Sequence, residues 1–221
     1  NDGVLPISKD EKILIAGPYT HERRSHLGTW TLDFDIKQVD TIAEAFSQRS
    51  ENVIAPEFRL WDDITMNEVK NADTIIVALG ESANVTGEAN SLTDIDLPKE
   101  QLEYIKKMKS YGKKVIGILC FGRPVGLQAA EPYLDAILYA WHSGTMAAHS
   151  IADIVYGDIN PSGRLPMTLP RCTGQIPIYY NYPTLPRNKN SYYGEGDSYH
   201  DCLSTPMYPF GYGLSYTEFE Y

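Results

Sequence analysis

The carboxylates of residues 80–97 are the part of the sequence best suited to chemistry. The stretch follows a continuous apolar run at residues 74–79, ends before Pro98 and carries Glu81, Glu88, Asp94 and Asp96 among small, turn-forming residues. A stretch of that composition is expected to be a loop. Carboxyl groups that act without a metal or a histidine catalyse by proton transfer, as in the hydrolysis of a glycosidic bond. A solvated acidic loop without a catalytic role fits these residues equally well.

Glu88 is the stronger candidate for a proton donor. It lies between Gly87 and Ala89, where the backbone can approach a ligand closely. A proton donor that works near neutral pH must be partly desolvated, and a loop glutamate that closes over a sugar pocket meets this requirement. Glu81 directly follows the apolar run, where a structural hydrogen-bonding role fits about as well.

Other common chemistries lack their sequence motifs. The chain contains no GxxxxGK[ST], HExxH or GxSxG motif, and no GxGxxG follows an expected strand. The five histidines are scattered; His142 and His149 can share a helix face, but surface or structural histidines fit better than metal ligands. No cysteine belongs to a CxxC pair. We therefore expect no metal and no cofactor.

Two cysteines leave a second question open. Cys172 and Cys202 lie in loop-like sequence and can pair in an oxidising compartment. Their spacing alone does not establish that they are close enough to do so. Free thiols are the favoured interpretation.

The elements that must position the acidic loop alternate between strands and helices. Such alternation predicts an α/β fold: a three-layer sandwich with a mostly parallel sheet and helices on both faces. Ligands bind such sheets beyond the carboxyl ends of the strands, where residues 80–97 would lie. Pro98 is expected in the first turn of its helix, and Gly157 is expected to close the last helix. The expected strands are residues 12–16, 51–55, 74–79, 114–120 and 136–141, and the expected helices are residues 35–50, 64–72, 98–111 and 144–156.

The character of the chain changes after Pro161, where Pro, Gly and Tyr are frequent and periodicity is weak. We expect one domain, with a sandwich core over residues 1–165 and an irregular arm over residues 166–221. Trp30 and Trp141 can stack on sugars, although packing in the core or between domains is the favoured interpretation.

Composition excludes two classes of partner. The chain has 221 residues and a formal net charge of −10, which fits poorly with nucleic acid. No apolar run approaches 18 residues, so no membrane span is expected. The first residues lack the features of a signal peptide and are typical of the middle of a longer chain.

Several motifs together resemble the C-terminal sandwich domain of family 3 glycoside hydrolases, the β-glucosidase and β-xylosidase group. They cover nearly the whole chain in the family's order. The most specific of them is the stretch from Ile151 to Pro166, which contains Tyr-Gly-Asp-Ile-Asn-Pro-Ser-Gly-Arg-Leu-Pro. The others lie at residues 13–18, 27–30, 77–81, 86–89, 97–101, 121–124, 174–177 and 208–216.

The resemblance implies an (α/β)6 sandwich that packs on an N-terminal (β/α)8 barrel, which is absent from this chain. In the family the barrel supplies an aspartate nucleophile, the sandwich supplies the glutamate acid/base, and hydrolysis retains configuration. By resemblance, Glu88 is the catalytic residue, and Glu81 and Thr86 are substrate-binding residues. The implied enzyme is an exo-acting β-glycosidase that releases terminal β-linked sugars from oligosaccharides or glycosides. The resemblance also favours a periplasmic or secreted parent protein.

Three departures from the family pattern put substrate preference in doubt, because each removes a polar group near the expected pocket. They are Leu92 in the loop, Thr145-Met146-Ala147-Ala148, and Phe121 before Gly-Arg-Pro. A non-catalytic scaffold or carbohydrate-binding module is therefore the alternative function. A flavodoxin-like nucleotide binder is a weaker alternative, because no glycine phosphate loop is present. Without the barrel, we expect the fragment to be inactive and to self-associate.

Overall fold

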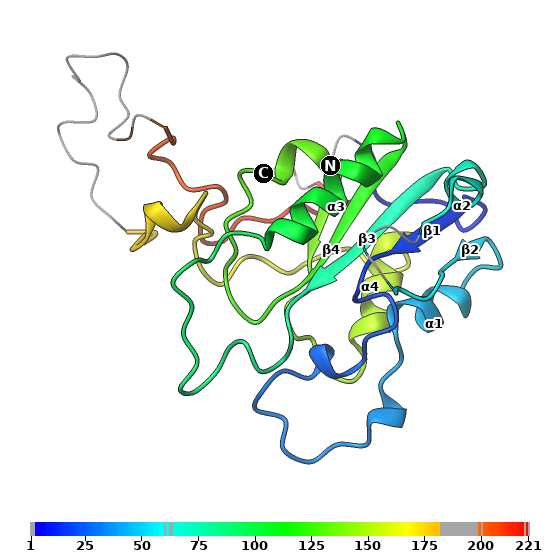
Figure 1. The fold of residues 1–221 in the computed structure, drawn as a ribbon, viewed down its shortest axis with the longest axis horizontal. Coiled ribbons are helices and arrows are strands. Elements are labelled where there is room, and N and C mark those ends of the chain that lie inside the picture. Colours follow the sequence, from blue (N-terminus) through cyan, green and yellow to red (C-terminus); the bar gives the residue numbers. More distant parts are fainter. Residues whose placement is uncertain are drawn as a thin grey trace.

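A parallel β-sheet forms the middle layer of the computed structural model, which describes residues 3–59, 61, 64–181, 199, 201–218 and 220. The sheet has five strands in the order β2-β1-β3-β4-β5, and all neighbouring pairs are parallel (Figure 1). The strands are β1 (Ile13–Ala16), β2 (Val53–Ile54), β3 (Thr74–Gly80), β4 (Lys114–Cys120) and β5 (Ala136–Tyr139). This arrangement confirms the predicted α/β fold class.

Strand β3 lies at the centre of the sheet, between β1 and β4, and all seven of its residues are buried. Successive side chains of a strand point to opposite faces. Ile76 and Ala78 accordingly enter one hydrophobic core, and Ile75, Val77 and Leu79 enter the other. A strand covered on both faces explains why the run is apolar without alternation.

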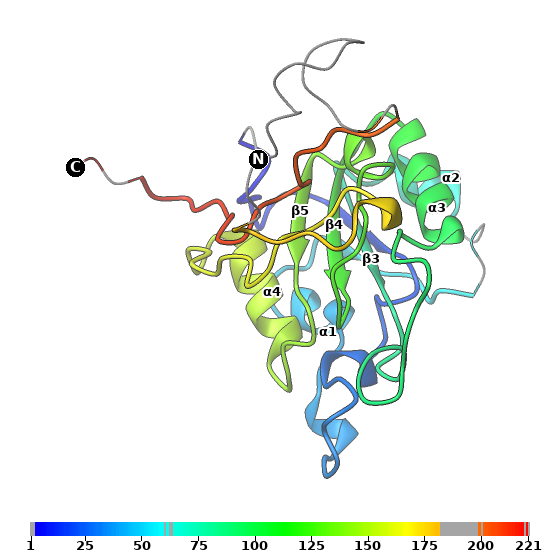
Figure 2. The same ribbon diagram turned by 90° about the vertical axis from the view of Figure 1, so that its left-hand side faces the viewer.

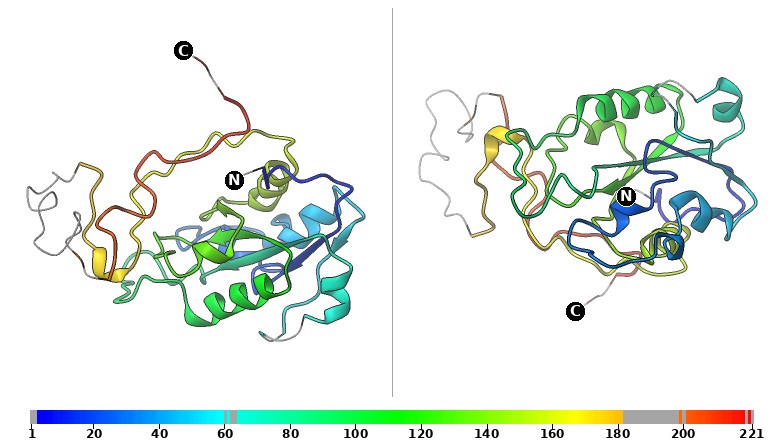
Figure 3. Two further views of the ribbon diagram at one scale, coloured as in Figure 1. Left: turned by 90° about the horizontal axis from the view of Figure 1, so that it is seen from above. Right: turned by 60° about the horizontal axis from the view of Figure 1, so that its bottom comes forward.

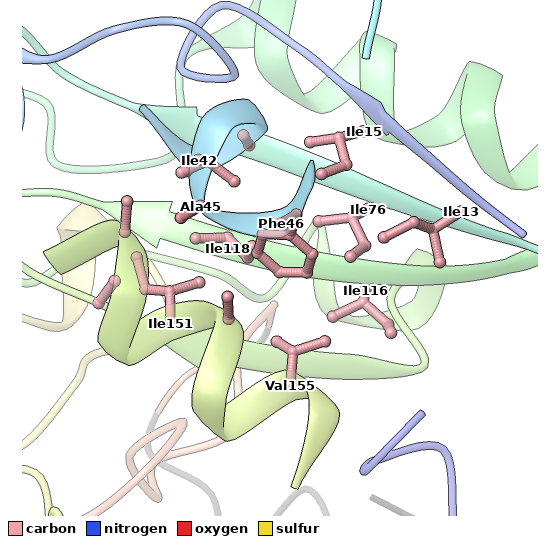
Figure 4. Close-up of a cluster of buried hydrophobic side chains, with 14 of the residues drawn as sticks. Ile13, Ile15, Ile42, Ala45, Phe46, Ile76, Ile116, Ile118, Ile151 and Val155 are labelled. Atoms are coloured by element: carbon pink, nitrogen blue, oxygen red, sulfur yellow. The ribbon is translucent and has the colours of Figure 1, made fainter. Parts of the chain in front are cut away.

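Helices α1 (Ile42–Ser47) and α4 (Ala147–Tyr156) cover one face of the sheet. Figure 4 shows Phe46 and Val155 turned toward the isoleucines of β3 and β4. Phe46 is fully buried, and burial of such a side chain contributes roughly 1.5–3 kcal/mol. This layer therefore fixes α1 and α4 against the sheet.

Helices α2 (Met66–Lys70) and α3 (Lys99–Ser110) lie on the opposite face (Figure 2). Helix α3 buries Tyr104, Ile105 and Met108 in the core on this side of the sheet. The three layers of the predicted sandwich are thus helices, sheet and helices. Among the helices of the described residues, none is both long and apolar enough to cross a bilayer.

The helix predicted at residues 35–50 is wrong in its first half. The structure has a 3-10 turn, η2 (Ile36–Gln38), and then α1, with extended backbone at Val39 and Thr41 between them. The Thr41 side chain accepts a hydrogen bond from Glu44 N, and Glu44 accepts one from Thr41 N, which forms a capping box. The helical spacing of apolar residues continues across this break, so periodicity alone could not reveal it.

The ends of two other helices also differ from expectation. Pro98 lies at the N-cap of α3 and not in its first turn, and α4 begins at Ala147 and not at residue 144. Gly157 ends α4 in a left-handed conformation with φ of 79°, as predicted, because glycine adopts this conformation without steric cost. Strand β5 ends before Trp141, whose φ is 55°.

The described parts of the chain after Pro161 contain no α-helix and only an isolated antiparallel bridge, between Leu169 and Tyr208. Residues 161–175 and 201–218 run alongside one another over the sandwich (Figure 3). Leu169 is buried, and Tyr208 packs against the core on the α3 side. Residues 182–198, 200, 219 and 221 of the predicted arm lie outside the described residues. The short turns not yet mentioned are η1 (Arg24–His26), η3 (Glu131–Tyr133) and η4 (Thr173–Gln175).

Candidate active site

The acidic loop, residues 81–98, leaves the carboxyl end of β3. Figures 1 and 2 both show it at the same end of the molecule as the long connection that follows β1. The two connections are in contact, because the Thr29 side chain bonds to backbone carbonyls of the loop. This is the edge of a parallel sheet at which ligands bind.

Glu88 lies at the exposed tip of this loop. It is a central residue of a turn in which Asn90 N donates to Gly87 O over 3.2 Å. Gly87 has φ of 120° and Ala89 has φ of 61°, so positive-φ residues flank Glu88 on both sides. Within the part of the chain that the structure describes, the Glu88 carboxyl group forms no hydrogen bond or ion pair. It is therefore available to a group outside this chain.

Glu81 lies at the start of the loop and is paired with Arg123. The Arg123 Nε atom donates to Glu81 Oε2 over 2.9 Å, and Nη2 donates to Oε1. Both side chains are nearly buried, with 12% and 10% exposed. A bidentate pair of this kind has fixed geometry. The predicted role of Glu81 in substrate binding stays a prediction, but both its oxygens already face a cation.

Arg123 also holds the far end of the loop. Its Nη1 atom donates to the carbonyl of Ile95 over 2.8 Å, and Gly126 N donates to the same carbonyl over 3.0 Å. One guanidinium group, on the turn after β4, thus joins the residue that opens the loop to a residue near its end. The backbone of Arg123 is held in turn, because Tyr139 OH donates to its carbonyl over 2.6 Å.

Thr29 fastens the middle of the loop. Its hydroxyl group lies within hydrogen-bonding distance of Ala83 O and Thr86 O, which is 2.5 Å away. A hydroxyl has one hydrogen to donate, so the two carbonyls share it. A side chain at Gly87 would come within about 3.1 Å of Thr29 Cγ2. The close contact with Thr29 and the positive φ together explain why residue 87 is glycine.

Thr86 points back toward the turn that carries Arg123. A Cβ atom on Gly122 would overlap both Thr86 Oγ1 and the ring of His142, so these two side chains converge on the bare backbone of Gly122. Burial lowers the pKa of His142. No described residue bonds to its buried Nε2 atom. The predicted role of Thr86 in substrate binding stays a prediction.

Asp94 and Asp96 are engaged by the segment after Pro161. Thr173 N donates to Asp96 Oδ1 over 2.8 Å, Thr173 Oγ1 bonds to Asp94 Oδ1 over 2.8 Å, and Ile95 N donates to Thr173 Oγ1 over 2.9 Å. The backbone N–H of Asp96 and then the Thr173 hydroxyl lower the pKa of Asp94. These two carboxylates therefore stabilise the second half of the loop.

The sequence did not reveal the three side chains that hold the loop. Arg123 carried a usable signal, because it follows a buried strand and so lies at the same sheet edge as Glu81. Thr173 carried none, and Thr29 was marked only as part of the motif at residues 27–30, since each lies in irregular backbone far from the loop in sequence. The shared helix face of His142 and His149 is also wrong: only His149 lies within α4, where it contacts Asp40 and Arg49. His200 lies outside the described residues.

Apolar side chains are exposed around the same edge of the sheet. Trp30 is 67% exposed and Leu32 is 89% exposed, so Trp30 is not part of the core. Trp141 is partly buried and lies against Tyr139, with ring centroids 4.3 Å apart. No group of three or more potential metal ligands occurs among the described residues. The remaining exposed apolar residues of these connections are Phe34, Ile36, Leu92 and Met146.

Comparison with known proteins gives one consistent answer. The model of the glycosyl hydrolase family 3 C-terminal domain matches residues 1–216. The periplasmic beta-glucosidase of Salmonella typhimurium is 33% identical over 97% of this chain, and thermostable beta-glucosidase B of Acetivibrio thermocellus is 30% identical over 100% of it. The crystal structure of a Listeria innocua beta-glucosidase in complex with gluconolactone matches 98% of the chain, with a TM-score of 0.87 and 35% identity. The chain spans about a third of each relative, 32%, 31% and 31% respectively.

Proposed function

Because the chain belongs to the family of glycosyl hydrolase family 3 C-terminal domains, we propose that it is the acid/base half of a retaining, exo-acting β-glycosidase. The parent enzyme releases terminal β-linked sugars from oligosaccharides or glycosides. This domain supplies Glu88 as the general acid/base, and the loop around Glu88 forms part of the substrate pocket. The observation that carries the proposal is the exposed, unpaired carboxyl group of Glu88 on a loop that is fastened elsewhere.

The other three carboxylates of the loop support the choice of Glu88, because each of them already has a partner within the chain. Glu81 is paired with Arg123, and Asp94 and Asp96 are bonded to Thr173. A general acid must come within hydrogen-bonding reach of the leaving oxygen, and of the four carboxylates only Glu88 has no competing partner among the described residues. Glu88 therefore protonates the leaving oxygen and then, as a base, activates the water that releases the sugar.

The nucleophile of this reaction lies outside the chain. Retention requires a second carboxylate about 5 Å from the acid/base, across the scissile bond. The relatives are about three times as long as this chain, which leaves room for a (β/α)8 barrel that supplies it. Trp30 and Leu32, exposed beside the loop, suit packing against such a domain. We assign residues 1–221 to one domain, with the arm after residue 165 as its irregular part.

Replacement of Glu88 by Gln in the full-length parent tests this role. Loss of the proton donor should slow hydrolysis about 10²–10⁴-fold for substrates with poor leaving groups. Activated aryl glycosides should lose much less, because their leaving groups need little protonation. The matched control is Glu51→Gln, an exposed glutamate at the opposite edge of the sheet, which should leave both rates unchanged. An equal loss on both substrate types would argue against an acid role for Glu88.

A non-catalytic carbohydrate-binding scaffold is the second candidate function. It is favoured by the exposed apolar side chains of Leu92, within the loop, and Met146, at the start of α4, because polar contacts to a sugar would be useful at this edge of the sheet. A parent protein that binds β-glucosides in calorimetry without hydrolysing them, and whose binding is unaffected by Glu88→Gln, would support this second function.

The proposed location of the parent is the periplasm or the exterior of the cell. The support is the name of one relative, a periplasmic beta-glucosidase. The N-terminal sequence of the full-length parent decides the matter, because an exported protein carries an export signal that precedes residue 1 of this chain.

A further inference from the structure

Cys172 and Cys202 lie next to each other, although 30 residues separate them in sequence. Their Sγ atoms are 4.0 Å apart, both residues are partly exposed, and both are free thiols. We propose that the two cysteines form a disulfide bond in the mature parent protein, and that this bond locks the segment that supports the acid/base loop.

The backbone around both cysteines is already joined by hydrogen bonds. Gln175 Nε2 donates to Leu203 O over 3.1 Å and to Thr205 O over 3.0 Å. Arg171 Nε donates to Thr205 O over 2.8 Å. The two segments that the disulfide joins, residues 171–175 and 203–205, are therefore already held together by hydrogen bonds before the bond forms. For the bond to form, the two sulfur atoms must approach from 4.0 Å to about 2 Å.

The sulfur of Cys202 can also be reached from solvent. Cys202 lines a surface cavity of about 530 Å³ together with Arg171 and Leu203. In the reduced form its thiol is within 3.3 Å of Gln128 Oε1, which accepts its hydrogen. Cys120 differs in every respect: it is fully buried in strand β4, and burial raises its pKa to about 12. Of the three cysteines, only Cys172 and Cys202 are placed for oxidation.

The oxidant is a disulfide carried by another protein or by glutathione. The thiolate of one cysteine attacks the oxidant and forms a mixed disulfide, which releases one thiol of the oxidant. The thiolate of the second cysteine then attacks the first, forms the Cys172–Cys202 bond and releases the other thiol. The cysteines lose two electrons and two protons, and the oxidant takes up both electrons and both protons. An oxidising compartment supplies such oxidants, which agrees with an exported parent.

The bond acts on the acid/base loop through the residue next to Cys172. Thr173 holds Asp94 and Asp96 in the second half of the loop. Fixing Cys172 to Cys202 fixes Thr173 relative to the sandwich, and with it the end of the loop that carries Glu88. This effect on activity depends on the function proposed above, whereas the bond itself does not.

The bond is tested on the full-length parent, purified without reductant and treated with glutathione disulfide. Free thiols are alkylated, and peptides are mapped by mass spectrometry before and after reduction. The expected result is one cross-linked pair of peptides that contain Cys172 and Cys202, with Cys120 alkylated only after denaturation. Separate alkylation of Cys172 and Cys202 in the treated protein would overturn the proposal.

Stability gives an independent measurement. The oxidised protein should unfold at a temperature about 5 °C or more above that of the reduced protein, because the bond restricts the unfolded chain. Cys172→Ser, Cys202→Ser and the double variant should match the reduced wild type, and reductant should not change their unfolding temperature. A reductant effect that persists in the double variant would contradict the assignment. Both readouts are independent of sugar hydrolysis, so they separate failure of this proposal from failure of the proposed function.

Discussion

Arg123 joins the two ends of the acid/base loop through one side chain. Its guanidinium group bonds to Glu81 at one end of the loop and to Ile95 near the other. Lysine keeps the charge but has no planar fork of donors, so it cannot make both contacts with the same geometry. With lysine at this position, no single side chain would connect Glu81 at the start of the loop with Ile95 near its end.

We expect Arg123→Lys in the parent enzyme to lower kcat/KM about 100-fold, because a misplacement of roughly 1 Å at a catalytic group costs that much. Glu81 keeps a cation beside it but loses its bidentate hydrogen bonds, which should destabilise the fold by about 1–2 kcal/mol. Kinetics on aryl glycosides and urea unfolding measure the two effects. Arg164→Lys, at an exposed arginine that bonds to Ser215, is the control and should change neither. Unchanged kinetics in Arg123→Lys would show that the ion pair does not position the loop.

His26 gives the fold a dependence on pH. It is buried, no described residue bonds to either ring nitrogen, and burial lowers its pKa to about 4. The unfolded chain, with a histidine pKa of about 6.5, binds more protons than the native state between these values. Stability therefore falls as pH decreases from about 6.5 to about 4 and is fully present above that window.

We expect His26→Phe to reduce this loss of stability at low pH. The free energy of unfolding, measured with urea at several pH values between 7 and 4, should change less steeply with pH in the variant than in the wild type. The slope should not vanish, because burial also lowers the pKa of His142. His21→Asn, at a partly exposed histidine that contacts Ala55 O and Pro56 O, is the control. Identical slopes for His26→Phe and the wild type would contradict the assignment.

At the scale of single elements, helix α1 begins at a point that side-chain hydrogen bonds determine. Thr41 and Glu44 form the capping box that separates α1 from the turn before it. Thr41→Ala should lower the free energy of unfolding by about 1 kcal/mol, because a donor at the helix start loses its acceptor. Thr41→Ser keeps the hydroxyl and should retain most of the stability. Equal losses in the two variants, measured by thermal unfolding, would assign the effect to packing of the Thr41 methyl group.

The strands could be predicted from the sequence because local composition determines them: β3 and β4 are continuous apolar runs between turn signals. The loop after β3 and the position of Glu88 in it followed from the length of that connection. The starts of α1 and α4 could not be predicted, because apolar spacing continues ahead of both helices, whereas the end of α4 at Gly157 was predicted. The contacts of Thr29, Arg123 and Thr173 with the loop were also beyond prediction, since each joins segments far apart in sequence.

For the molecule as a whole, the most telling surface feature is the group of exposed apolar residues beside the loop. Trp30 and Leu32 extend from the connection after β1 with most of their surface exposed. Patches of exposed apolar side chains mark surfaces that bind another protein or domain. They lie at the edge that carries Glu88, so a domain that covered them would also face the proposed catalytic group.

We expect the isolated chain to hydrolyse no aryl β-glucoside or β-xyloside and to self-associate. The other described carboxylates of the loop are not placed as a nucleophile opposite Glu88, since Glu81, Asp94 and Asp96 are engaged elsewhere. Leu32→Glu should reduce self-association, as measured by analytical ultracentrifugation, without affecting the fold. Glu51→Gln is the control for that measurement. Turnover by the fragment alone, after host glycosidases have been removed, would mean that the catalytic groups lie elsewhere.

The three attachments of the acid/base loop also set the order in which a nascent chain can complete the domain. Thr29 precedes its partner Ala83 by 54 residues, Arg123 follows Glu81 by 42, and Thr173 follows Asp96 by 77. At roughly 5–20 residues per second, the ribosome releases Thr173 several seconds after it has released the loop. During this interval the central strands can already pair, while the second half of the loop still lacks Thr173. The second half of the loop that carries Glu88 therefore depends on a segment translated well after the glutamate itself.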